Sequence, residues 1–339
     1  MIEKYSPDQV AEMIISIDPA FHLPSDEQRP IISIYDNPLE PAVVIAGAGS
    51  GKTETMAARV VYLVANEIAR PDQILGLTFT RKAAGELNTR IRKRLRQFQQ
   101  AQDKQGIART FSSLDTAVTT YHSYAGRLLS EHAIRYGIDA DVQPLGEAAL
   151  WMAANKLVRE WDDGTFATSD AASTVVKDLL GLTSMVLEHR VTVDQIRDAD
   201  EKVLHELAQM TGATNEETRR VAKVLSQRIA MLPMMESFLE ARRQSGELSF
   251  DDQIALAADI AVNFSDVGVL ERAKYPIVLL DEYQDTSQSQ VRLLSALFGG
   301  GHPVTAVGDP CQSIYTWRGA SSGTISAFNT NFPKSDGAT

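Results

Sequence analysis

Residues 46–53 of the chain, AGAGSGKT, are of the types that hold a polyphosphate. Their glycines allow a tight turn and let backbone N–H groups face an anion. Lys52 can reach the terminal phosphates, and the Thr53 hydroxyl can hold Mg²⁺. The pattern G-x-x-x-x-G-K-[ST] has glycine where this chain has Ala46, and a small residue still fits there. We predict a phosphate-binding loop, and the alternative is a Gly-rich turn that binds nothing.

A second group that could do chemistry is the acidic pair Asp281 and Glu282, within LLDEYQD at residues 279–285. The pair follows an apolar run, and α/β sheets place ligand chemistry at the carboxyl ends of their strands. Asp281 is placed to hold Mg²⁺, and Glu282 is a candidate general base for the water that attacks a γ-phosphate. An acidic pair alone is weak evidence. Together with the glycine loop, it supplies the other part of one site.

The elements that must position these groups form an α/β pattern. Apolar, β-branched runs predict five strands of one parallel sheet, at residues 42–46, 74–79, 117–120, 277–280 and 304–307. Helical spacing predicts helices at residues 52–68 and 81–98, and the polar residues 99–113 predict a loop. Ser6 and Ser249 are predicted to cap further helices.

The middle of the chain has a different pattern of apolar residues. Residues 126–247 show helical spacing of apolar side chains and no comparable buried strand. We therefore predict an all-helical subdomain inserted into a single α/β domain. Met231, Met234 and Met235 lie beside Pro233, and we interpret them as core filling at a helix kink.

Composition sets broad limits on the protein. The chain has 339 residues, of which 44% are hydrophobic and 23% charged, as is typical of globular domains. One cysteine, Cys311, excludes an internal disulfide framework and suits a reducing cytosol. No apolar run reaches the roughly 18 residues of a membrane span, and no signal peptide is visible. We expect a cytoplasmic protein with no membrane partner.

Two features have two interpretations each. The net charge of −11 argues against nucleic-acid binding, yet a basic strip at residues 90–96 could meet DNA phosphates. Charge alone favours the alternative, a solvated helix face paired with nearby acids.

Gln28 could read an adenine edge, or it could close a capping box with Ser25. Pro30 is awkward for a helix that begins at Asp26.

The motifs of this chain, and their order along the sequence, resemble those of superfamily 1 helicases of the UvrD/Rep/PcrA type. The resemblance covers residues 23–125 and 247–330. The sequence LTFTRKAAGEL (77–87) is similar to motif Ia, YHSYAGRLL (121–129) to the Ib region, LLDEYQD to motif II and VGDPCQSIYTWRGA (307–320) to motif III. The resemblance implies a RecA-like domain 1A in residues 1–125 and 248–339. The helical insertion, residues 126–247, then corresponds to subdomain 1B.

The resemblance also implies roles for individual residues. Lys52, Glu282 and Gln312 serve catalysis, with Gln312 as the γ-phosphate sensor, and Thr53 and Asp281 hold Mg²⁺. The implied ATP contacts are Gln28, Ala46, Gly47, Ala48, Gly49, Ser50, Gly51, Lys52, Thr53 and Glu54. The implied single-strand path is lined by Thr78, Phe79, Thr80, His122, Tyr315, Trp317 and Arg318. Aromatic side chains suit this role because every base has a face on which they can stack.

The implied function is the N-terminal motor half of an ATP-dependent 3′-to-5′ DNA helicase or translocase in DNA repair or recombination. Its expected substrates are single-stranded DNA and duplexes with a 3′ single-stranded tail, at the nucleoid of a bacterial cytoplasm. The chain stops at Thr339, before motifs IV to VI and a second RecA-like domain, so weak isolated activity is expected. The alternative is an ATP- and DNA-binding module that docks a partner motor or nuclease. Glu54 and the GDPC form of motif III resemble the actinobacterial helicase–nuclease branch, which makes a partner helicase–nuclease subunit a candidate.

Overall fold

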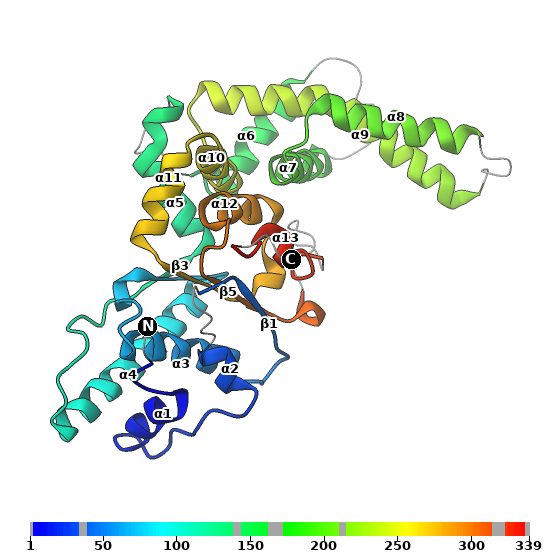
Figure 1. The fold of residues 1–339 in the computed structure, drawn as a ribbon. Coiled ribbons are helices and arrows are strands. Elements are labelled where there is room, and N and C mark those ends of the chain that lie inside the picture. The colour runs from blue at the N-terminus through cyan, green and yellow to red at the C-terminus, as the bar shows by residue number, and fades with distance from the viewer. Residues whose placement is uncertain are drawn as a thin grey trace. The chain divides into compact units, whose positions relative to one another are not determined.

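The computed structural model describes residues 3–33, 39–137, 144–161, 172–209, 215–313 and 323–335. Contacts within the chain divide it into two compact units. One unit combines Met1–Arg127 with Ala257–Thr339, and the other is Leu128–Leu256. The second unit is thus inserted between the two parts of the first (Figure 1). The contact-based boundaries fall at residues 128 and 256, where the sequence predicts 126 and 247.

The first unit is built on a five-stranded parallel sheet. Its strands are β1 (Ala42–Ile45), β2 (Ile74–Thr78), β3 (Ala117–Thr120), β4 (Ile277–Leu280) and β5 (Val304–Gly308), in the order β1-β5-β4-β2-β3. Every pairing is parallel, so the carboxyl ends of all five strands meet at one edge. The predicted fold class is confirmed, an α/β unit on a parallel sheet with an inserted run of helices.

Helices cover both faces of this sheet (Figure 1). On one face, α1 (Pro7–Ile15), α3 (Lys52–Ala65) and α4 (Arg81–Gln105) share a core with Ile277 and Leu279 of β4. The other face carries α11 (Ser265–Lys274) and α12 (Gln288–Phe298). Both faces of the inner strands are buried, which explains why β4 reads as an unbroken apolar run.

Short elements complete the first unit. They are the helices α2 (Gln28–Ser33) and α13 (Phe328–Asn331) and the 3₁₀ turns η1 (Pro71–Gln73), η3 (Tyr283–Asp285) and η4 (Pro310–Gln312). The helix expected from Asp26 begins instead at Gln28, which places Pro30 in the first turn, where its missing N–H costs no hydrogen bond.

The predicted loop at residues 99–113 is wrong in its first part. Helix α4 continues through this polar stretch to Gln105 and ends where Gly106 adopts the left-handed region, with φ of 68°. Gln, Ala and Lys are good helix formers, and a left-handed glycine is a common helix end. Ala101 and Gln102 are buried, so the extension belongs to the core even though it lacks large apolar side chains.

The second unit contains only helices among its described residues. They are α6 (Glu147–Glu160), α7 (Ala172–His189), α8 (Val193–Gln209), α9 (Glu216–Gln244) and the 3₁₀ turn η2 (Ala133–Tyr136). Helices α5 (Tyr121–His132) and α10 (Phe250–Asn263) run through the boundaries between the units.

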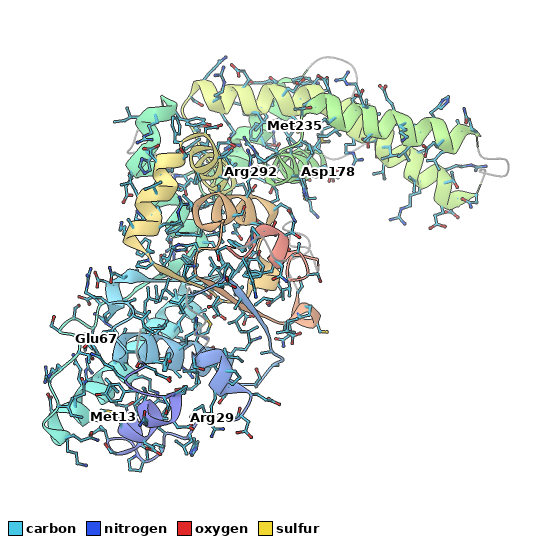
Figure 2. The ribbon with its side chains drawn as sticks, viewed as in Figure 1. Met13, Arg29, Glu67, Asp178, Met235 and Arg292 are labelled. Atoms are coloured by element: carbon cyan, nitrogen blue, oxygen red, sulfur yellow. The ribbon has the colours of Figure 1, made fainter. Side chains whose placement is uncertain are left out.

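The methionine cluster beside Pro233 fills the core of the helical unit, as predicted. Met231, Met234 and Met235 are all buried, and they pack with Leu179 of α7. Figure 2 labels Met235 in this unit and Met13 in the core of the first.

The capping predictions also hold. Ser6 begins α1 in a capping box, and the Ser249 hydroxyl accepts the Asp252 N–H at the start of α10. Among the described residues, no single helix has the length and apolar composition of a membrane span. Only α10 and α11 together reach them, with a bend of 101° between the two.

Candidate active site

The glycine loop lies at the carboxyl end of β1 and leads directly into α3. Gly49 and Gly51 have φ values of 76° and 83°, in the left-handed region where a side chain would be strained. The N–H of Ala46 donates to the carbonyl of Gly308 at 3.0 Å, so this residue continues the pairing of β1 with β5. Residues 47–50 are exposed and therefore accessible to a ligand at the amino end of α3.

The acidic pair ends β4 and approaches the loop lysine. Nζ of Lys52 lies 3.6 Å from Oε2 of Glu282. Asp281 is 5% exposed, and burial together with the Glu282 charge raises its pKa to about 6. Glu282 adopts φ of 50° and ψ of 44°, a left-handed conformation that is uncommon for a residue with a side chain. The sheet thus brings Lys52, Asp281 and Glu282 to one place, although more than 200 residues separate the two motifs.

The loop after β5 belongs to the same edge. Asp309 accepts the N–H of Cys311 at 2.9 Å, and its other carboxylate oxygen accepts the side-chain amide of Gln312. Gln312 lies on the short 3₁₀ turn η4, which follows β5. In the sheet, β5 lies between β1 and β4. Because β5 neighbours β1, this turn lies at the same end of the sheet as the glycine loop.

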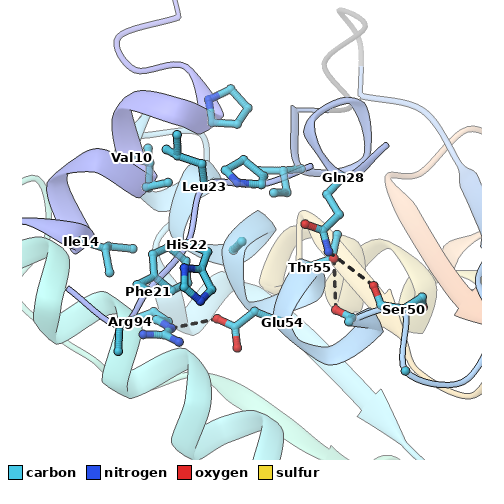
Figure 3. A pocket seen from close by; sticks show the side chains of 18 residues that line it. Val10, Ile14, Phe21, His22, Leu23, Gln28, Ser50, Glu54, Thr55 and Arg94 are labelled. Atoms are coloured by element: carbon cyan, nitrogen blue, oxygen red, sulfur yellow. Dashed lines mark hydrogen bonds and ion pairs between the residues drawn. The ribbon is translucent and has the colours of Figure 1, made fainter. Parts of the chain in front are cut away.

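A cavity of about 410 Å³ adjoins the glycine loop (Figure 3). Its lining comes from α1, the segment 20–24, α2, residues 49–51, the first turns of α3 and Arg94 of α4. Val10, Ile14 and Phe21 supply apolar surface, and Gln28 and Arg94 supply hydrogen-bond donors. An apolar cavity with a few polar groups is typical of small-molecule sites.

Gln28 makes the contacts of a capping box and one further contact with the glycine loop. Its Oε1 accepts the Ser25 N–H at 3.1 Å, and the Ser25 hydroxyl accepts its N–H, which completes the capping box. Its Nε2 meanwhile donates to the carbonyl of Ser50 at 3.4 Å, so Gln28 ties α2 to the glycine loop. The cap uses the side-chain oxygen, and the side chain also lines the cavity, where a base could reach it.

Glu54 has partners that the sequence did not reveal. Its carboxylate accepts from Arg94 Nε at 2.9 Å and from an Arg90 guanidinium nitrogen at 2.8 Å. The Arg94 guanidinium lies 4.1 Å above the Phe21 ring and also reaches Asp18. A negative charge beside the glycine loop is thus balanced by two arginines from α4.

The basic strip of α4 is largely ion-paired. Besides these two arginines, Lys93 pairs with Asp18 at 3.2 Å, and Arg92 pairs with Asp115. Arg96 is exposed. The contacts match the alternative interpretation of the strip, a helix face that pairs with nearby acids.

The described residues predicted to line a single-strand path gather at two neighbouring strand ends. Thr78 of β2 pairs with Thr120 of β3, so Phe79 and His122 follow adjacent strands. Phe79 and His122 are half-buried, and Thr80 is exposed and caps α4. Thr78, by contrast, is fully buried, so it can support this surface but not form it. The predicted contacts Tyr315, Trp317 and Arg318 lie outside the described residues.

The parallel sheet, the glycine loop between β1 and α3 and the carboxylates at the end of β4 define an α/β protein of the P-loop type. The family profile of the UvrD/REP helicase N-terminal domain matches residues 25–333, and the chain belongs to this family.

Curated relatives include the ATP-dependent DNA helicase PcrA of Leuconostoc citreum, 30% identical over 293 residues, which are 86% of this chain and 34% of the relative. PcrA of Staphylococcus aureus is 26% identical, over 91% of this chain and 36% of the relative. A probable DNA helicase II homolog of Mycoplasma capricolum is 25% identical, over 94% of this chain and 38% of the relative. The chain therefore spans little more than a third of the length of these relatives.

Proposed function

We propose that the chain is the N-terminal motor half of an ATP-dependent 3′-to-5′ DNA helicase or translocase that acts in repair or recombination. The first unit corresponds to RecA-like domain 1A and the helical unit to 1B. The observation that carries the proposal is the approach of Lys52 to Glu282 at 3.6 Å, at the sheet edge where Asp281 also lies. Family membership supports the use of ATP and DNA.

Asp281 and Thr53 are the residues that would hold Mg²⁺. Carboxylate and hydroxyl oxygens are suitable ligands for this cation. Burial raises the pKa of Asp281 to about 6, and a bound cation would stabilise its ionised form. When bound, the ion would stabilise the negative charge that develops during phosphoryl transfer.

Lys52 and Glu282 form an ion pair in the structure, and bound nucleotide breaks this pair. A γ-phosphate carries more negative charge than a carboxylate and competes for the Lys52 ammonium. The Glu282 carboxylate is then released to accept a proton from the attacking water. Gln312 and the backbone of residues 47–51 position the phosphates. The cavity beside Gln28 binds the adenine base.

The DNA-binding surface is proposed at the ends of β2 and β3, where Phe79, Thr80 and His122 gather, extended by Tyr315, Trp317 and Arg318. A second RecA-like domain, in the remaining part of a full-length protein, would supply arginine fingers. Such arginines contribute about 10³ to 10⁵ in rate, so the chain alone should turn over slowly. A helicase–nuclease subunit is a candidate partner, at the nucleoid of a bacterial cytoplasm.

The test is ATP turnover with and without oligo-dT, together with a thermal shift by nucleotide in the presence and absence of Mg²⁺. We expect Mg²⁺-dependent binding, low turnover, and no turnover in Glu282→Gln, which should still bind nucleotide. Equal turnover in Glu282→Gln would remove this residue from the role of base. Binding without turnover, even when the second domain is supplied, would instead support a docking module.

A further inference from the structure

Gln284 links the two halves of the candidate active site. It is 2% exposed, and both ends of its side-chain amide are engaged. Its Nε2 donates to Oε2 of Glu282 at 2.8 Å, and its Oε1 accepts the backbone N–H of Asp309 at 3.0 Å. The first partner follows β4 and the second follows β5, so one amide bridges two neighbouring strand ends.

The bridge lies within a continuous series of contacts. Oε2 of Glu282, which accepts from Gln284, is also the atom that lies 3.6 Å from Lys52 Nζ. At the other end, the Asp309 carboxylate accepts the side-chain amide of Gln312. The contacts therefore run from the loop lysine through Glu282, Gln284 and Asp309 to Gln312.

The backbone around Gln284 is shaped for this close approach. A Cβ placed on Gly308 would lie 2.5 Å from Gln284 Oε1 and 3.2 Å from its backbone nitrogen. A glycine is thus required at the end of β5 for the amide to reach Asp309. Glu282, on the other side, holds its left-handed backbone conformation next to the bridge. Such conformations persist where the surroundings fix them.

A side-chain amide satisfies both contacts at once. It donates to a carboxylate and accepts from an N–H in the same plane, whereas an ionised carboxylate can only accept. Glutamate at this position would also add a third negative charge beside Glu282 and Asp285, whose Oδ2 lies 3.4 Å from the Gln284 amide nitrogen. An apolar residue would leave the buried Asp309 N–H without this acceptor.

We propose that Gln284 is a positioning residue that couples Glu282 to the loop carrying Gln312. The inference rests on the proposed function. When a γ-phosphate engages Lys52 and Gln312, both ends of the series move together, and Gln284 transmits the change at one end to the other. Gln284 itself touches neither the nucleotide nor the attacking water.

The experiment compares the affinities for MgADP and for the magnesium complex of a non-hydrolysable ATP analogue, measured by titration calorimetry. The proteins are the wild type, Gln284→Ala, Gln312→Ala and the double variant. We expect Gln284→Ala to lower the affinity for the triphosphate about tenfold and that for MgADP less than twofold. We further expect the double variant to lose no more than the larger single loss, because coupled residues are not additive.

Controls separate coupling from a loss of folding. Gln99→Ala removes another buried glutamine, which donates to the Phe111 carbonyl at 2.9 Å, and should leave both affinities unchanged. Gln284→Met retains the side-chain volume without the hydrogen bonds and serves if the alanine variant does not fold. It should show the same selective loss.

The outcomes are distinguishable. If the wild type binds neither nucleotide, the proposed function itself fails. If the wild type prefers the triphosphate and the Gln284 variants retain that preference in full, or if the losses at the two positions add, the coupling is refuted. Equal binding of both nucleotides by the wild type refutes it as well, because no γ-phosphate response then exists to transmit.

Discussion

Neutralising Asp281 should stabilise the protein in the absence of nucleotide and metal. Its pKa is about 6 in the folded protein, against 3.8 for an unperturbed aspartate, because the side chain is buried beside the Glu282 charge. One pKa unit corresponds to 1.36 kcal/mol, so ionisation of this carboxyl costs the folded state about 3 kcal/mol. Asp281→Asn removes the charge and retains an oxygen that can accept the Glu282 N–H, which Oδ1 accepts at 3.1 Å.

The sign of the pH dependence follows from the two pKa values. The folded pKa lies above the unfolded one, so the contribution of neutral Asp281 is fully present below pH 3.8 and is lost as the pH rises through 6. The asparagine variant does not titrate at this position. Its advantage over the wild type should therefore grow from about 1.6 kcal/mol at pH 5 to about 3 kcal/mol at pH 7.5.

The assay is urea unfolding in EDTA, at several pH values between 5 and 7.5, for the wild type and Asp281→Asn. Asp259→Asn is a matched control, because Asp259 is also buried but pairs with Arg292 at 3.5 Å, and its replacement should bring no gain. Mg²⁺ with nucleotide should reverse the order and favour the wild type. A stability difference that is constant with pH, or a variant that is less stable at pH 7.5, would show that ionised Asp281 does not destabilise the folded protein.

Three further changes test other contacts. Glu54→Gln removes the negative charge that pairs with Arg90 and Arg94 beside the glycine loop. Nucleotide affinity should therefore rise several-fold at low salt, and the gain should fade as salt is added; a loss of affinity would contradict this. Gly308→Ala should cost about 1 to 3 kcal/mol in urea unfolding, and less when Gln284→Ala has already removed the clashing amide. Arg92→Glu should leave the salt dependence of DNA binding unchanged, since this arginine is already ion-paired; a flatter slope would restore a DNA role for the strip.

The sequence was most informative where one local pattern fixes one element. The five strands coincide with short apolar runs, so each could be located, and their parallel direction follows from the helices between them. Helix caps such as Ser6 depend on neighbours only three residues away, and they too were predictable. The extent of α4 was not, because its last turns are polar and only their packing shows that they belong to the core.

Contacts between distant segments account for what the sequence did not reveal. Glu54 could be recognised as unusual, yet its pairing with Arg90 and Arg94 depends on how α4 packs against α3. Gln284 stands inside the LLDEYQD motif, but its role as a bridge depends on the adjacency of β4 and β5. The nearness of Gly308 to the Gln284 amide is a signal that only the three-dimensional structure carries.

The position of β1 at the edge of the sheet has a consequence for synthesis. Its only partner among the described strands is β5, with Ala42 opposite Thr305. The ribosome adds about 5 to 20 residues per second, so the roughly 260 residues between them take on the order of 10 to 50 s to emerge. Throughout that interval the strand that carries the glycine loop has no hydrogen-bonded neighbour. A nascent chain should therefore acquire nucleotide affinity abruptly, only after β5 has left the exit tunnel, and a chain stalled before that point should have none.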